Sequence, residues 1–198
     1  NDAFISLFTL DQTNDNIEAL TISGTLTYTG DLVSSTAGTS NFRAGVNAGD
    51  AITSGGNENV VVGDEAGTAI TTGDDNSALG FRALSTNTTS GRNVAIGHDA
   101  LRVLNHTDGT NGNNVAIGHG AGEAMTTGTQ NTIVGATAGD ALTDCDFNVA
   151  MGMEALSTDT QGSRSTAIGK GTLKNQNFTS ASDVYNTAVG YEAGNDIT

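Results

Sequence analysis

The sequence predicts an all-β fold, a parallel β-solenoid in which the chain winds through stacked coils. Two observations lead to this class. A short apolar run that ends in glycine recurs nine times at a nearly fixed spacing, as in Asn-Val-Ala-Ile-Gly at residues 93–97 and again at 114–118. The 198 residues also include 27 glycines, no proline and no tryptophan, and only 36% of them are hydrophobic. That composition favours thin repeated layers over one large core.

The glycine that closes each run sets the length of one coil. Successive closing glycines are 17, 18 or 21 residues apart, which is too short for a helical hairpin repeat and suits one coil of a β-solenoid. The 21-residue interval occurs once in every four, so the chain also repeats with a period of 72 residues. The closing glycines are Gly45, Gly63, Gly80, Gly97, Gly118, Gly135, Gly152, Gly169 and Gly190.

An asparagine opens nearly every unit, four residues before its closing glycine. Aligned asparagine side chains form hydrogen-bonded ladders in stacked β-structures. Asparagine also suits turn conformations, and this second interpretation stays open. Ser165 replaces the asparagine in one unit. The opening asparagines are Asn41, Asn59, Asn76, Asn93, Asn114, Asn131, Asn148 and Asn186.

Each predicted strand is apolar on both faces. The residue before the closing glycine is large, as at Ile117, and the residue before that is usually alanine, as at Ala116. These two side chains face opposite ways, because successive residues of a strand alternate. We expect the large residues to fill the coil. The alanines would then form an outward stripe, from Ala78 to Ala188, that another copy of the chain covers.

After the closing glycine, one position alternates between glycine and leucine. It is the fourth residue on, for example Leu101 in one unit and Gly122 in the next. Where glycine stands there, an aliphatic residue such as Met125 follows three residues later, whereas most leucine units have a polar residue at that later place. We therefore expect each coil to supply one more core side chain from one of two places.

The chain divides into two parts. Residues 41–198 form the repeat array, predicted as nine coils. Residues 1–40 lack the repeat, although residues 20–28 alternate as a strand does, and they are expected to be a cap, a connector or an assembly arm. The array stops partway through a coil at Thr198, so we expect the native chain to continue.

Charge and composition argue against several classes of partner. Seven Lys and Arg stand against 22 Asp and Glu, a net charge of −15 that would repel nucleic acid and anionic membranes. No apolar run is long enough to span a membrane, so no membrane insertion by this segment is expected. The lone Cys145 is expected to be a small buried side chain.

No catalytic, cofactor or metal site is predicted. The sequence has no nucleophile motif, no phosphate-binding loop and no carboxylate pair common to neighbouring coils. His98 and His119 lie in adjacent coils, but no cysteine or carboxylate accompanies them at a fixed ligand spacing.

The residue after the closing glycine varies most and offers the candidate contact surface. A varying stripe on a regular scaffold is typical of residues that face solvent. It would equally serve as a contact surface for a cell-surface glycan, with rings as stacking or polar groups. The candidates are Phe81, His98, His119 and Tyr191.

The units at residues 93–101, 114–122 and 186–194 resemble those of two related families. These are the heads of trimeric autotransporter adhesins and the shafts of bacteriophage tail fibres, and the likeness covers about residues 41–198. The resemblance implies three parallel chains, each a left-handed β-roll. It also implies a role in attachment at a cell or virion surface. The coil is longer here than in the adhesin heads, and its grouping by four differs from them.

The function expected from these observations is that of a non-catalytic structural and adhesive shaft of an extracellular fibre, in which another copy of the chain covers the strands. The expected partner is the chain itself, as a homotrimer. One alternative is a subunit that polymerises end to end into an extracellular filament through residues 1–40. Another is a glycan-hydrolysing spike segment.

Overall fold

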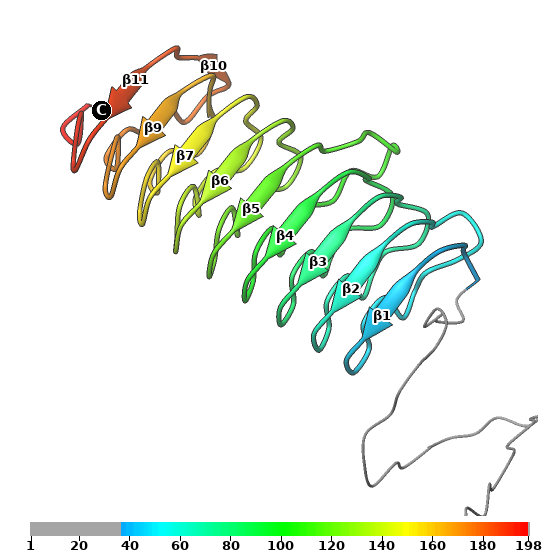
Figure 1. The fold of residues 1–198 in the computed structure, drawn as a ribbon. Coiled ribbons are helices and arrows are strands. Elements are labelled where there is room, and N and C mark those ends of the chain that lie inside the picture. Colours follow the sequence, from blue (N-terminus) through cyan, green and yellow to red (C-terminus); the bar gives the residue numbers. More distant parts are fainter. Residues whose placement is uncertain (1–36, 198) are drawn as a thin grey trace, which may run out of the picture. The chain divides into compact units, whose positions relative to one another are not determined.

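The computed structural model describes residues 37–197, and over this range the chain is a parallel β-solenoid of about nine coils (Figure 1). Most of the arm predicted over residues 1–40, with the strand at 20–28, lies outside the described residues. The described range contains no α-helix, and hence no helix that could cross a membrane. The predicted fold class is confirmed.

Each coil contributes one strand to a nine-stranded sheet, and Figure 1 shows these strands side by side in a single row. All pairs are parallel, and equivalent residues lie level: Ala95 pairs with Ala116, and Ile96 with Ile117. The strands of this sheet are β1 (Phe42–Ala44), β2 (Val60–Val62), β3 (Ser77–Leu79), β4 (Val94–Ile96), β5 (Val115–Ile117), β6 (Thr132–Val134), β7 (Val149–Met151), β9 (Thr166–Ile168) and β11 (Thr187–Val189). A second sheet of two strands, β8 (Gly162–Ser163) and β10 (Ser182–Asp183), joins the coils that begin with β7 and β9.

The closing glycines turn the chain at the end of each strand, and two constraints require glycine there. Their φ angles are positive, for example 140° at Gly118, a region that residues with a side chain avoid. They also stack on one another, so that a Cβ atom built on Gly118 would lie 2.5 Å from the carbonyl oxygen of Gly135. The regular spacing seen in the sequence is thus the spacing of these stacked corners.

The strand faces are the reverse of those expected from the sequence. The alanines are buried in the coil interior, with Ala95 and Ala116 fully inaccessible. The large residues beside them point outward: Leu79 is 48% exposed and Ile117 is 38% exposed. The predicted outward alanine stripe is therefore wrong, and the stripe that faces outward is aliphatic.

The narrow interior explains why alanine occupies the inward place. The opposite wall of the coil already sends a large aliphatic side chain into the space behind the strand, so a second large residue there would overpack it. Larger inward residues occur at Val61 and Ile133, in units where glycine stands on the facing wall. A Cβ atom built on Gly67 would lie 2.6 Å from Val61 Cγ1, and one on Gly139 would lie 3.3 Å from Ile133 Cδ1.

In most coils the facing wall supplies one large aliphatic core side chain from one of two places, as predicted, whereas the coil of Leu101 supplies two because Leu104 is also fully buried. Leu84 and Leu101 fill the interior from the fourth position after the glycine, and Ile70 and Met125 fill it from the seventh position. A Cβ atom on Gly67 would lie 2.8 Å from Ile70 Cδ1, which shows that the two places serve the same volume. Their side chains are fully buried.

The asparagine ladder is confirmed, and it links both neighbouring coils and opposite walls. The backbone N–H of Asn131 donates to Oδ1 of Asn114 at 3.0 Å, and Asn148 repeats this bond to Asn131 at 2.9 Å. The side-chain nitrogen Nδ2 of Asn131 also donates across the coil to the carbonyl oxygen of Cys145 at 2.7 Å. The asparagines from Asn59 to Asn148 are buried, so these bonds satisfy polar groups that water does not reach.

Where Ser165 interrupts the asparagine ladder, the buried side chain of Gln176 supplies the missing hydrogen bonds. Ser165 still donates its N–H to Asn148 Oδ1 at 2.8 Å, but its side chain is too short to continue the series. Gln176 reaches in from the next loop, donates to Ser165 Oγ at 3.2 Å and accepts from Asn186 Nδ2 at 2.8 Å. Gln176 also donates to the buried carboxylate of Asp159 at 2.6 Å.

Candidate interaction surfaces

The outer face of the main sheet carries a continuous aliphatic column, which we call the outer stripe. Each side chain lies directly beside its neighbour in the next coil, because the strands pair in register. A second column on the same face, from Val60 to Thr187, contains valine, serine and threonine and is partly buried along most of its length. The outer stripe consists of Val62, Leu79, Ile96, Ile117, Val134, Met151, Ile168 and Val189.

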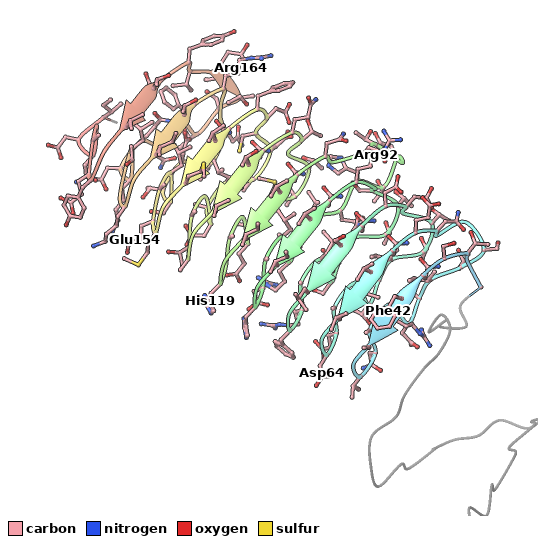
Figure 2. The ribbon with its side chains drawn as sticks, in the orientation of Figure 1. Phe42, Asp64, Arg92, His119, Glu154 and Arg164 are labelled. Atoms are coloured by element: carbon pink, nitrogen blue, oxygen red, sulfur yellow. The ribbon has the colours of Figure 1, made fainter. Side chains whose placement is uncertain are left out.

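Three of the four predicted contact residues come together as a stack of rings at the corner that follows the strands. The rings of Phe81 and His98 have centroids 5.1 Å apart, and those of His98 and His119 are stacked at 5.0 Å. Figure 2 shows His119 at this edge of the array. Tyr191 occupies the same column but lies in the last coil, beside Lys170, whose ammonium is 5.5 Å from the ring.

An ion-pair network adjoins the ring stack and centres on Asp99, a carboxylate that is largely buried. Its Oδ2 atom lies 2.8 Å from Arg82 Nη2 and 2.9 Å from His98 Nδ1. Arg102 lies 3.8 Å from Asp99 Oδ1 and makes a closer pair, at 2.9 Å, with Glu123 of the next coil. The two arginines and two carboxylates balance in charge, so this edge is not a basic patch.

The geometry of the ring stack limits what it can bind. The rings of His98 and His119 are stacked, the ring of Phe81 is tilted by 42° against that of His98, and the Arg82 guanidinium lies 4.9 Å from the Phe81 ring centroid. His98 therefore lies between two other rings and presents little free face to a flat ligand. Ring edges and polar atoms are what this column offers to a partner.

A second aromatic column, on the opposite edge of the array, was missed by the sequence analysis. The guanidinium of Arg164 lies 4.4 Å from the centroid of Phe147 and 5.9 Å from that of Tyr185. Figure 2 shows Arg164 on the edge that also carries Arg92, across the row of strands from His119. The sequence did contain a signal, which is position. A unit's opening residue follows immediately after each of Arg92, Phe147, Arg164 and Tyr185.

The thiol of Cys145 is not set up to react. Cys145 is buried as predicted, and burial, with the nearby Asp159 next in importance, raises the pKa of its thiol to about 12. A thiol with so high a pKa stays protonated and is a poor nucleophile at neutral pH. Within residues 37–197, no group of three or more His, Cys, Asp or Glu side chains is arranged to hold a metal ion.

The repeat itself defines the kind of protein that these surfaces belong to: a β-solenoid with a buried asparagine ladder. Comparison of the chain with protein-family models, curated proteins and solved structures gave no match.

Proposed function

We propose that this chain is a structural and adhesive shaft of an extracellular fibre, non-catalytic, in which copies of the chain associate side by side through the outer stripe. The observation that supports this most strongly is the outer stripe itself. It presents large aliphatic residues in at least eight consecutive coils, and several of them are more than a third exposed. Continuous apolar patches of this kind on soluble proteins are typical of interaction sites.

A second copy of the chain is the partner that best suits the stripe. A stripe that runs the length of the array needs a partner that offers an equally long apolar surface, and an identical array supplies one. Burying the aliphatic side chains would stabilise the assembly by about 25 cal/mol for each Å² removed from water. A homotrimer of parallel chains is the arrangement implied by the resemblance to adhesin heads and phage tail-fibre shafts.

An elongated array is suited to attachment because it places its edges at a distance from an anchoring point. The two edges carry rings and polar groups that vary from coil to coil, whereas the core columns hardly vary. On this proposal the core and the outer stripe serve assembly, and the edges serve contact with a cell or virion surface.

Replacing Ile117 by Glu tests the assembly. The variant would place a charge in the middle of the outer stripe, and an unpaired ion in a buried interface costs on the order of several kcal/mol per copy. We expect light scattering at micromolar concentration to give an oligomer for the native chain and single chains for Ile117→Glu. Gln130→Glu adds the same charge at an exposed edge position and should leave the mass unchanged.

Electron microscopy separates the shaft from the end-to-end filament. A shaft gives rods of one length at every concentration, whereas a filament subunit gives rods that lengthen as the concentration rises. A native chain that is monomeric at micromolar concentration would refute the side-by-side assembly, and so would an Ile117→Glu variant with the native mass.

A further inference from the structure

The column that contains Arg164 differs between the two 72-residue blocks in a way that points to a binding site. In the first block, Asp75, Arg92 and Asn113 occupy three successive coils, and Arg92 Nε lies 3.6 Å from Asp75 Oδ2. The residues 72 positions later are Phe147, Arg164 and Tyr185. Both blocks therefore keep the central arginine, but the second block flanks it with two rings in place of a carboxylate and an amide.

The fold does not require these rings. The backbone is the same in both blocks: φ is 59° at Asp75 and 60° at Phe147, and 50° at Asn113 and 58° at Tyr185. Left-handed φ angles of this kind favour asparagine and aspartate and are uncommon for bulky side chains. The second block thus places aromatic residues where the backbone least favours them. A function for the rings explains this choice better than folding does.

The rings and the polar groups around them form an exposed surface. Phe147 is 40% exposed and Tyr185 is 67% exposed, although apolar rings usually seek burial. Asp183 of β10, in a coil of 21 residues, forms an ion pair with Arg164 at 3.0 Å from Oδ1 to Nε, and its Oδ2 accepts from the Tyr185 hydroxyl at 3.2 Å. The site therefore brings together a guanidinium, a carboxylate and two rings, one of which carries a hydroxyl.

We infer that Phe147, Arg164, Asp183 and Tyr185 form a binding site for a neutral glycan. Arg164 lies over both rings, and the parts of Phe147 and Tyr185 that remain exposed suit the C–H groups of a sugar. The hydroxyls of a sugar both donate and accept, which suits a carboxylate beside a guanidinium and a phenol. The charges of Arg164 and Asp183 cancel, and the chain carries a net charge of −15, so an acidic glycan would be repelled. This inference rests on the proposed adhesive role and gives it a ligand class and a place.

The test uses the full chain on an array of neutral oligosaccharides of glucose, galactose, mannose and N-acetylglucosamine, with sialylated and uronic-acid oligosaccharides on the same array. We expect the native protein to bind one or more neutral glycans. The double variant Phe147→Asp, Tyr185→Asn carries the residues of the first block at these positions, so it should fold and should lose at least tenfold in affinity. Its thermal unfolding, followed by circular dichroism, checks the fold.

Phe81→Asp is the matched control, because Phe81 is 41% exposed and also carries an arginine over its ring. It should bind neutral glycans within twofold of the native protein. Loss of binding in Phe81→Asp with retention in the double variant would overturn the inference and assign binding to the ring stack. Preference for acidic glycans, or no binding by the native chain, would also overturn it.

A transplant into the first block provides a gain-of-function test. The triple variant Asp75→Phe, Asn111→Asp, Asn113→Tyr builds the same set around Arg92, and two sites on one rod should raise the apparent affinity for a long polysaccharide several-fold. An unchanged affinity would contradict the inference. Light scattering on the same samples tests assembly separately, so a failure to bind glycan with an intact oligomer would refute this site alone.

Discussion

At the scale of single residues, the smallest side chains decide how the coils stack. Glycine at each corner lets one coil lie directly on the next, and alanine on the inner face leaves room for the side chain from the facing wall. Replacing either by a larger residue strains contacts with a neighbouring backbone or with a packed side chain.

Gly118→Ala should be strongly destabilising. The added methyl would meet the backbone of Gly135 at 2.5–2.6 Å, and φ of 140° is unfavourable for any residue with a side chain. We expect the free energy of unfolding in urea to fall by at least about 2 kcal/mol. Gly109→Ala is the control: its φ is also positive, but a methyl there meets nothing within 4 Å. Its cost should stay near 1 kcal/mol, and equal losses for both variants would contradict the stacking argument.

Asp140→Asn should stabilise the fold at neutral pH. Burial, and after it repulsion from Glu123 and Glu154, raises the pKa of the Asp140 carboxyl above its ordinary value. When the Asp140 carboxyl is protonated in both the folded and the unfolded state, its raised pKa costs no stability. As the pH rises, the unfolded state ionises more readily, so the protein loses stability until the pH has passed the pKa of the folded state. Because the side chain is half exposed, solvent screening should limit the gain to a few tenths of a kcal/mol.

The stability of Asp140→Asn and the native protein should therefore converge as the pH falls below about 3.8, the ordinary value for aspartate. Asp50→Asn, at the equivalent place in the first coil, is the control: its side chain is exposed, so the substitution should stay within about 0.5 kcal/mol. Chemical denaturation at pH 3, 5 and 7 gives both curves. A gain for Asp140→Asn that persists unchanged at pH 3 would show that charge is not its cause.

At the scale of a coil, the ladder depends on one buried glutamine where an asparagine is missing. Gln176→Ala would leave Asp159 Oδ2 and Asn186 Nδ2 without the partners that they have now. A buried polar group without its partner costs about 1–3 kcal/mol, and more when it is charged. We expect a loss of about 2–4 kcal/mol in the free energy of unfolding. Asn177→Ala, its exposed neighbour, should stay within about 0.5 kcal/mol, and a neutral Gln176→Ala would show that water replaces the glutamine.

The coil's architecture was largely predictable from sequence, but the direction of its side chains was not. Periodic glycine, asparagine and alternating Gly/Leu positions indicate the corners, the ladder and the second core side chain, because each reflects a local requirement that recurs in register. The choice between Ala116 and Ile117 as the inward residue depends on how far the facing wall intrudes. That distance is a property of the closed coil and leaves no periodic signal in the sequence.

The candidate surfaces were predictable to different degrees for the same reason. Phe81, His98 and His119 stand at one place in consecutive units, so their stacking follows from the repeat. The set around Arg164 combines one such column, which holds Phe147, Arg164 and Tyr185, with Asp183 of β10. It becomes visible only when the two blocks are aligned at 72 residues and their contacts compared.

At the scale of the whole molecule, net charge opposes the proposed assembly. Each chain carries −15, and side-by-side copies bring these charges within tens of ångströms. Charges that far apart interact at 0.01 M ionic strength, where the Debye length is about 30 Å, and are largely screened at 0.15 M, where it is about 8 Å. We expect sedimentation to show tighter association at 0.15 M salt than at 0.01 M. An assembly held by ion pairs would weaken over the same range.

Because each coil meets the next through the same backbone bonds and stacked corners, the 72-residue block behaves as an interchangeable module. Unequal recombination between two copies of the encoding DNA would add or remove four coils at once, and every new junction would reproduce contacts that the native array already contains. The length of the array can thus change by whole blocks of four coils. Each added block would also bring further edge residues, which could change while those of the existing blocks stay the same.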